Sequence, residues 1–163
     1  MNRRRRHLHI ILIGVFFFAA FAAPPARASD IKLSPEALRG MDKIYSGDPD
    51  AAIAIAHDIE KAQPDHPLGY LLEAEAKWWK RYCVACEIKY GMVDPWKRSK
   101  EPDDNEYFAL TDKVTRLAEA QLAKSDTAEM HTYAGLGWAL KVRVYGLRNE
   151  NRNAANAGVS GRA

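Results

Sequence analysis

The sequence has only two cysteines and none of several short motifs that common enzyme classes need. It contains no G-x-S-x-G turn, no glycine-rich phosphate loop and no HExxH helix, which argues against the hydrolases, nucleotide-binding enzymes and zinc proteases that depend on them. A structural zinc site takes four ligands, whereas there is no second cysteine pair, and the histidines at 57, 66 and 131 do not follow ligand spacing. Apart from the cysteine pair discussed below, these absences predict that the protein is not an enzyme and has no metal or cofactor.

Basic charge is also scarce once the first 28 residues are set apart. The whole chain carries 24 basic and 21 acidic residues, a formal charge of +3, but five of the arginines lie within this N-terminal stretch. The rest of the chain therefore has 19 basic and 21 acidic residues, a net charge of −2. Because nucleic-acid binding needs a basic surface on the folded domain, we expect no nucleic-acid partner.

Residues 1–28 have the three parts of a secretory signal peptide. A block of four arginines is followed by an uncharged apolar run over 8–23, and Ala26-Arg27-Ala28 provides the small residues of a cleavage site. The run has 16 residues, fewer than the about 20 that a membrane-spanning helix needs. We predict cleavage near Ala28-Ser29, a secreted or periplasmic location in the cell envelope and no membrane insertion afterwards, with an uncleaved N-terminal membrane anchor as the alternative.

The remaining residues lack long alternating runs of β-branched side chains, which favours an all-α fold of about five main helices. Ser34 before Pro35 indicates the start of a first helix, and Asp48 before Pro49 the start of a second, which ends before Pro64. Three- and four-residue spacings of apolar side chains predict further helices over 68–89, 104–124 and about 126–147. Asp103 with Glu106 resembles a capping box for the fourth helix, and Ser125-Asp126 is expected to cap the fifth. The polar residues 149–163 predict a weakly structured tail, either a fraying helix or disordered chain.

The helix pair that begins at Leu33 resembles a tetratricopeptide (TPR) repeat. Small or turn-forming residues occupy the positions at which the 34-residue TPR pattern has them: Gly40, Gly47, Ala52, Ala56 and Pro64 in the first unit, Ala74 in the second and Gly135 in the third. The resemblance covers about 33–148 and implies a TPR-like domain over 29–148. Its antiparallel helix pairs stack as a short superhelix, with an insertion or linker at about 83–104.

The chain is also similar to exported bacterial TPR-type proteins of unassigned role, which continue through further helices. The third unit shows no strong second helix, although a solenoid needs a polar helix to cover its last apolar face. We therefore expect that the chain is truncated at its C-terminus.

The resemblance implies a protein–protein interaction scaffold or adaptor of the periplasm or cell envelope, with a protein or peptide partner that the sequence does not identify. In TPR proteins the first helix of each unit lines the concave face, and the register places Met41, Tyr45, Glu75, Trp79 and Leu136 there. Helical spacing of aromatic residues usually reflects packing, so we also expect that one of Trp78 and Trp79 is buried in the core and the other is half-exposed.

Cys83 and Cys86 are the sharpest chemical signal in the sequence. In an oxidising compartment they can form a structural disulfide or a redox pair, and metal binding also stays open. A c-type haem site is not predicted, because Glu87 stands where histidine must follow. An envelope thiol–disulfide redox protein is therefore the alternative function, and a non-functional fragment of a longer TPR protein is a third interpretation.

Overall fold

The computed structural model describes residues 31, 33–90 and 100–161, without the side chains of 84–90. Helices are the only regular secondary structure in these parts of the chain, and helix pairs pack against each other, so the predicted all-α class is confirmed. The helices are α2 (Pro35–Tyr45), α3 (Pro49–Ala62), α4 (Pro67–Tyr90), α5 (Asp104–Leu122), α6 (Ala128–Leu147) and α7 (Asn151–Ser160). The predicted signal peptide lies outside the described residues, as do residues 91–99 of the predicted linker, whose residues 83–90 belong to α4. Among the described helices, none is long and apolar enough to cross a membrane.

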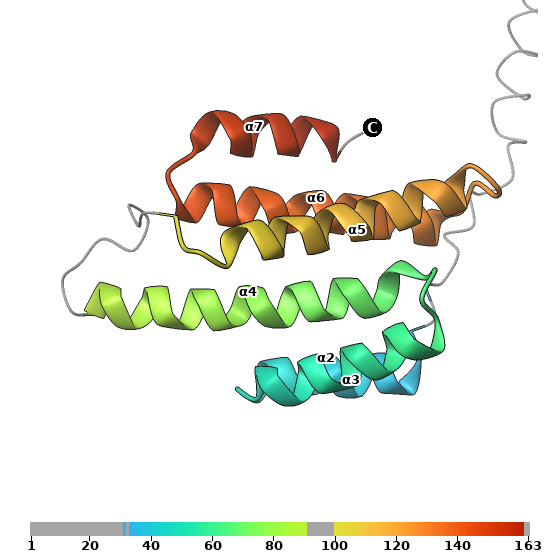
Figure 1. The fold of residues 1–163 in the computed structure, drawn as a ribbon, viewed down its shortest axis with the longest axis horizontal. Helices are drawn as coiled ribbons and strands as arrows, with labels where there is room; N and C mark the ends of the chain where they lie inside the picture. Colours follow the sequence, from blue (N-terminus) through green and yellow to red (C-terminus); the bar gives the residue numbers. More distant parts are fainter. Residues whose placement is uncertain (1–30, 32, 91–99, 162–163) are drawn as a thin grey trace, which may run out of the picture.

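Each helix packs against the next one along the chain, and α4 also contacts α2 and α6 (Figure 1). Among the first members of the three pairs, α4 therefore lies between α2 and α6, and the two members of each pair are also neighbours. This arrangement is the TPR-like stacking that the repeat register predicts. It places three helices side by side along one face of the domain.

The first two helices begin where the sequence predicts. The Ser34 hydroxyl accepts a hydrogen bond from the Ala37 amide at 3.1 Å, and the Asp48 carboxylate accepts one from the Ala51 amide at 3.2 Å. A proline follows each cap, where its missing N–H costs no helical hydrogen bond. Gly47 between the helices has a φ of +84°, a left-handed conformation that glycine adopts without strain.

The predicted capping box at the start of α5 is wrong. The Asp103 side chain makes no cap hydrogen bond, because its carboxylate instead accepts from Arg81 of α4. Glu106 pairs with Lys77 of α4. Both acidic side chains therefore hold α5 against α4.

The predicted cap of α6 is displaced by one or two residues. The hydroxyl of Thr127 accepts from the Met130 amide at 3.3 Å, so threonine is the cap in place of Ser125-Asp126. The Asp126 carboxylate lies 2.7 Å from the His131 ring. That contact gives Asp126 another partner.

Of the two forms expected for the tail over 149–163, a fraying helix or disordered chain, the structure has a helix, because Asn151–Ser160 forms α7 against α6 (Figure 1). Ala157 is buried, and a Cβ added to Gly161 would lie only 3.0 Å from the Cβ of Trp138. Small residues therefore bring α7 close to α6 with little apolar area, which is why the sequence suggested a tail. The third pair therefore has a second helix. The expectation of truncation was based on the lack of such a helix, and that argument no longer holds.

The residues predicted to pack the repeats occupy several helix crossings. Ala52, Ala56 and Ala74 are fully buried, and a Cβ on Gly40 would lie 2.4 Å from Cδ2 of Leu72. The carbonyl of Pro64 accepts a hydrogen bond from the Tyr70 hydroxyl at 3.2 Å.

Gly135 lies away from the α5–α6 crossing. A Cβ there would lie 3.7 Å from the Gly161 carbonyl oxygen, on the side of α7. Gly137 is the glycine at the crossing, since its Cβ would approach Thr115 to 2.8 Å.

Candidate functional site: an apolar groove along three helices

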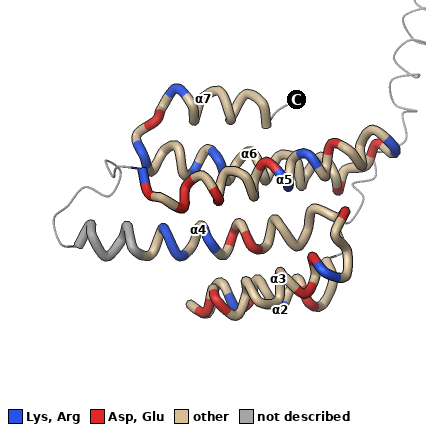
Figure 2. The backbone as a smooth tube through the Cα atoms, in the orientation of Figure 1, with Lys and Arg blue, Asp and Glu red and all other residues tan. Residues whose placement is uncertain are grey.

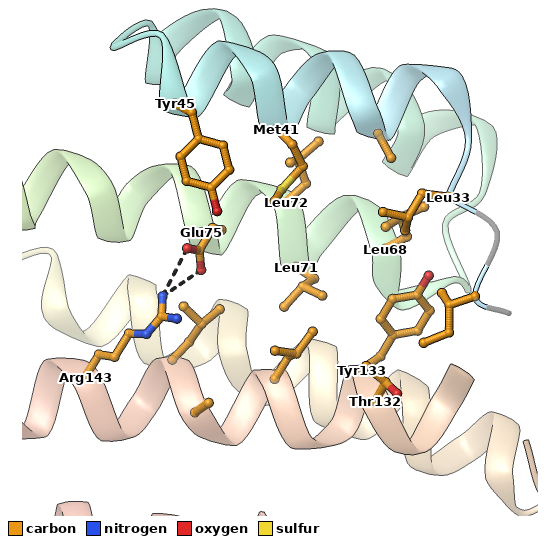
Figure 3. A pocket seen from close by; sticks show the side chains of 15 residues that line it. Leu33, Met41, Tyr45, Leu68, Leu71, Leu72, Glu75, Thr132, Tyr133 and Arg143 are labelled. Atoms are coloured by element: carbon orange, nitrogen blue, oxygen red, sulfur yellow. Dashed lines mark hydrogen bonds and ion pairs between the residues drawn. The ribbon is translucent and has the colours of Figure 1, made fainter. Parts of the chain in front are cut away.

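A cavity of about 400 Å³ runs between α2, α4 and α6 (Figure 3). We call it the groove. Its lining is predominantly aliphatic and aromatic, and side chains from all three helices and from the segment before α2 converge on it. They are Ile31, Leu33, Ala37, Met41, Tyr45, Leu68, Leu71, Leu72, Glu75, Thr132, Tyr133, Leu136, Ala139, Leu140 and Arg143.

Helical periodicity explains why these side chains meet. Residues three or four apart share one face of a helix, and α2 contributes Ala37, Met41 and Tyr45 at a spacing of four. α4 and α6 contribute comparable stripes, 68–75 and 132–143. Other faces of these helices pack against α3, α5 and α7, so each stripe is left for the groove.

The groove gathers most of the large apolar side chains that the described residues leave exposed. Six such residues are exposed: Ile31, Leu33, Leu38, Tyr45, Leu136 and Val159. Four of them line the groove, and Tyr45 there is 65% exposed. Apolar surface concentrated in one hollow is typical of a binding site rather than of scattered surface residues.

A charged pair closes one end of the groove (Figure 3). Arg143 donates through Nη1 to both carboxylate oxygens of Glu75, at 3.0 and 2.9 Å. The indole N–H of Trp79 donates to the same carboxylate at 3.1 Å, and the Trp79 ring meets the Tyr45 ring edge-on with centroids 5.9 Å apart. Glu75 is thus held from two sides, which fixes the polar end relative to the apolar wall.

The structure brings together four of the five residues that the repeat register assigned to the concave face. Met41, Tyr45, Glu75 and Leu136 line the groove, and Trp79 lies behind Tyr45 and Glu75. Whether they contact a partner stays a prediction. Trp78 is buried and Trp79 is half-buried, which confirms the expected division between these two aromatic residues.

Sequence reasoning missed several lining residues, above all Leu68, Leu71, Tyr133 and Arg143. The same periodicity could have found most of them. Leu68 and Leu71 lie seven and four residues before Glu75, and Arg143 lies seven after Leu136. The pairing of Arg143 with Glu75 could not be predicted from periodicity, because it joins residues 68 apart in the sequence.

Cys83 is exposed near the end of α4. The side chain of Cys86 lies outside the described residues. The disulfide or redox pair therefore stays a prediction. The described side chains contain one three-residue group that could hold a metal ion, and it lies between α3 and α4, not in the groove.

Comparisons with known protein families, with curated proteins and with solved structures found no match to this chain.

Proposed function

We propose that the groove binds an apolar segment of another protein, so that the chain serves as a TPR-like interaction scaffold or adaptor of the cell envelope. The observation that carries this proposal is the convergence of three helix stripes on one open apolar hollow (Figure 3). The N-terminal signal-like segment supports the location, and the TPR-like register supports the mode of binding.

The lining of the groove favours a peptide with apolar anchor side chains. Aromatic anchors supply much of the affinity at protein interfaces, and Tyr45 and Tyr133 both line the groove. The volume of about 400 Å³ suits a few large side chains. The Glu75–Arg143 pair presents charge at one end only, which gives a bound segment a preferred direction.

A lysine introduced into the groove should weaken binding of such a peptide. Peptides selected from a random display library on the wild-type protein provide the probe, and fluorescence anisotropy measures their affinity for each variant. We expect Leu136→Lys and Tyr45→Ala each to weaken binding by about tenfold or more, because one places a charge in an apolar site and the other removes an aromatic anchor. Leu136 and Tyr45 are 41% and 65% exposed, so neither change disturbs the core.

Val159→Lys is the matched control, because Val159 is 68% exposed on α7 and does not line the groove. Its affinity for the peptides should equal that of the wild type. Equal losses in Val159→Lys and Leu136→Lys, or a library that yields no peptide sensitive to Leu136→Lys, would contradict the proposal. Circular dichroism melting curves establish that each variant is folded.

A further inference from the structure

Three side chains that carry metal-ligating atoms meet between α3 and α4, outside the groove. His57 and Glu60 are three residues apart on α3 and so share one helix face, and Glu73 approaches them from α4. One ligand atom from each of the three lies within 4.8 Å of the other two. Nε2 of His57 is 3.4 Å from a carboxylate oxygen of Glu73.

Of the three residues, Glu73 is buried, Glu60 is half-buried and His57 is exposed. Glu73 is only 8% exposed, and Oε1 of Glu60 is buried with no hydrogen-bond partner among the described residues. Gly69 is the reason for this burial, since a Cβ at that position would lie 2.6 Å from Cγ of Glu60. Because glycine has no Cβ, α4 can come close enough to α3 to cover Glu60.

Two carboxylates in such a position cannot both be ionised unless positive charge lies near them. A carboxylate oxygen that is buried beside a second carboxylate is a group that a metal ion can satisfy in place of a shared proton.

We propose that His57, Glu60 and Glu73 bind one divalent transition-metal ion of the zinc type. An imidazole nitrogen with two carboxylate oxygens suits zinc, whereas magnesium and calcium prefer an all-oxygen site. Three protein ligands leave a fourth tetrahedral position for water. Zinc bonds of about 2.0–2.2 Å require the ligand atoms to approach one another more closely than 4.8 Å. The exposed side chain of His57 can supply that movement.

The two lysines next to the cluster, Lys77 and Lys113, each have another interaction partner. Lys77 lies 3.1 Å from Glu73, but its ammonium also pairs with Glu106 of α5. Lys113, whose charge acts on Glu60, has its ammonium 3.8 Å from the centre of the Tyr70 ring. A metal ion can therefore replace Lys77 at Glu73 without leaving that ammonium unpaired.

Calorimetric titration with zinc chloride tests the site on the full chain. Cys83→Ser and Cys86→Ser are introduced first, because thiolates also bind zinc, and bound metal is removed with a chelator. We expect one saturable ion per chain and a rise in melting temperature on addition of zinc. His57→Ala and Glu60→Gln should each weaken the affinity by at least about tenfold, since loss even of an outer-shell partner costs that much.

His131→Ala is the matched control, because this exposed histidine on α6 lies beside Asp126 rather than in the cluster. It should leave the titration unchanged. The proposal is overturned if zinc does not saturate, if His57→Ala and Glu60→Gln bind it as tightly as their parent, or if magnesium binds and zinc does not. It is also overturned if zinc raises the melting temperature of Glu60→Gln as much as that of its parent. The two carboxylates of the cluster would then share a proton and no metal ion.

Discussion

Replacement of Asp104 by asparagine should lower the free energy of unfolding by about 3–5 kcal/mol, because it removes the carboxylate that buried Arg148 contacts most closely and leaves only Glu101, at 3.6 Å, as an ion-pair partner. Arg148 donates through Nε and Nη2 to the two carboxylate oxygens of Asp104 at 2.7 and 2.6 Å. The two side chains are only 2% and 3% exposed. The pair joins the start of α5 to the end of α6, where basic residues of α4 also face the acidic residues at the start of α5 (Figure 2).

Urea denaturation of wild type and variant measures this loss. Asp126→Asn is the matched control, since Asp126 is 86% exposed beside His131, and exposed pairs contribute about 0–1 kcal/mol. A double variant, Asp104→Leu with Arg148→Met, should lose less than the sum of the two single changes, because neither charge then remains buried alone. A loss below about 1 kcal/mol for Asp104→Asn would show that the pair is not the anchor we describe.

The same pair predicts how stability changes in acid. Burial alone would raise the pKa of Asp104, but hydrogen bonds from Arg148 and the Glu101 amide, with the charges of Arg148 and Arg81, hold it below the usual 3.8. Because the folded pKa is then lower than the unfolded pKa, the contribution is complete above about pH 3.8 and is lost as the pH falls through the folded value. The stability difference between wild type and Asp104→Asn should therefore shrink below that pH.

Gly69→Ala should destabilise the protein by about 1–3 kcal/mol, although alanine is normally the better helix former. A Cβ at position 69 would lie 3.0 Å from the Glu60 backbone nitrogen and 3.1 Å from the Ala56 carbonyl oxygen. Backbone atoms cannot rotate away as a side-chain end can. The added methyl group therefore forces α3 and α4 apart over the length of their contact.

Gly146→Ala is the matched control for this effect. Gly146 lies in α6, and a Cβ there would meet nothing within 4 Å. This change should stabilise the protein by about 0.5–1 kcal/mol through helix propensity alone. Thermal or urea denaturation then gives opposite signs for the two substitutions. If both substitutions stabilise the protein, α3 and α4 lie farther apart at Gly69 than they do in the structure.

Features that depend on neighbouring residues could be predicted from the sequence. Ser34 and Asp48 stand directly before prolines, so the cap and the first helical turn come from adjacent residues. The groove-lining positions of Met41, Glu75 and Leu136 follow from periodicity, because a helix turns at a fixed rate and the repeat register fixes which face is inward.

Features that depend on distant packing could not be predicted. Asp103 and Glu106 fit a capping box locally, but Arg81 and Lys77 of α4 compete for their carboxylates. The cluster around Glu60 forms because Gly69 lets another helix approach, and neither residue signals this in the sequence. A run of polar and small residues is equally compatible with a loose tail and with a helix that needs only close contact.

The few contacts of α7 determine which part of the fold unfolds first. Among the described helices it touches only α6, and Ala157 is its single buried residue. Little hydrophobic free energy therefore holds it, whereas α5 and α6 share a core that includes Tyr107, Leu140 and Val144. The domain should fray from this end first, shedding its outermost layer while the three helices that shape the groove remain assembled.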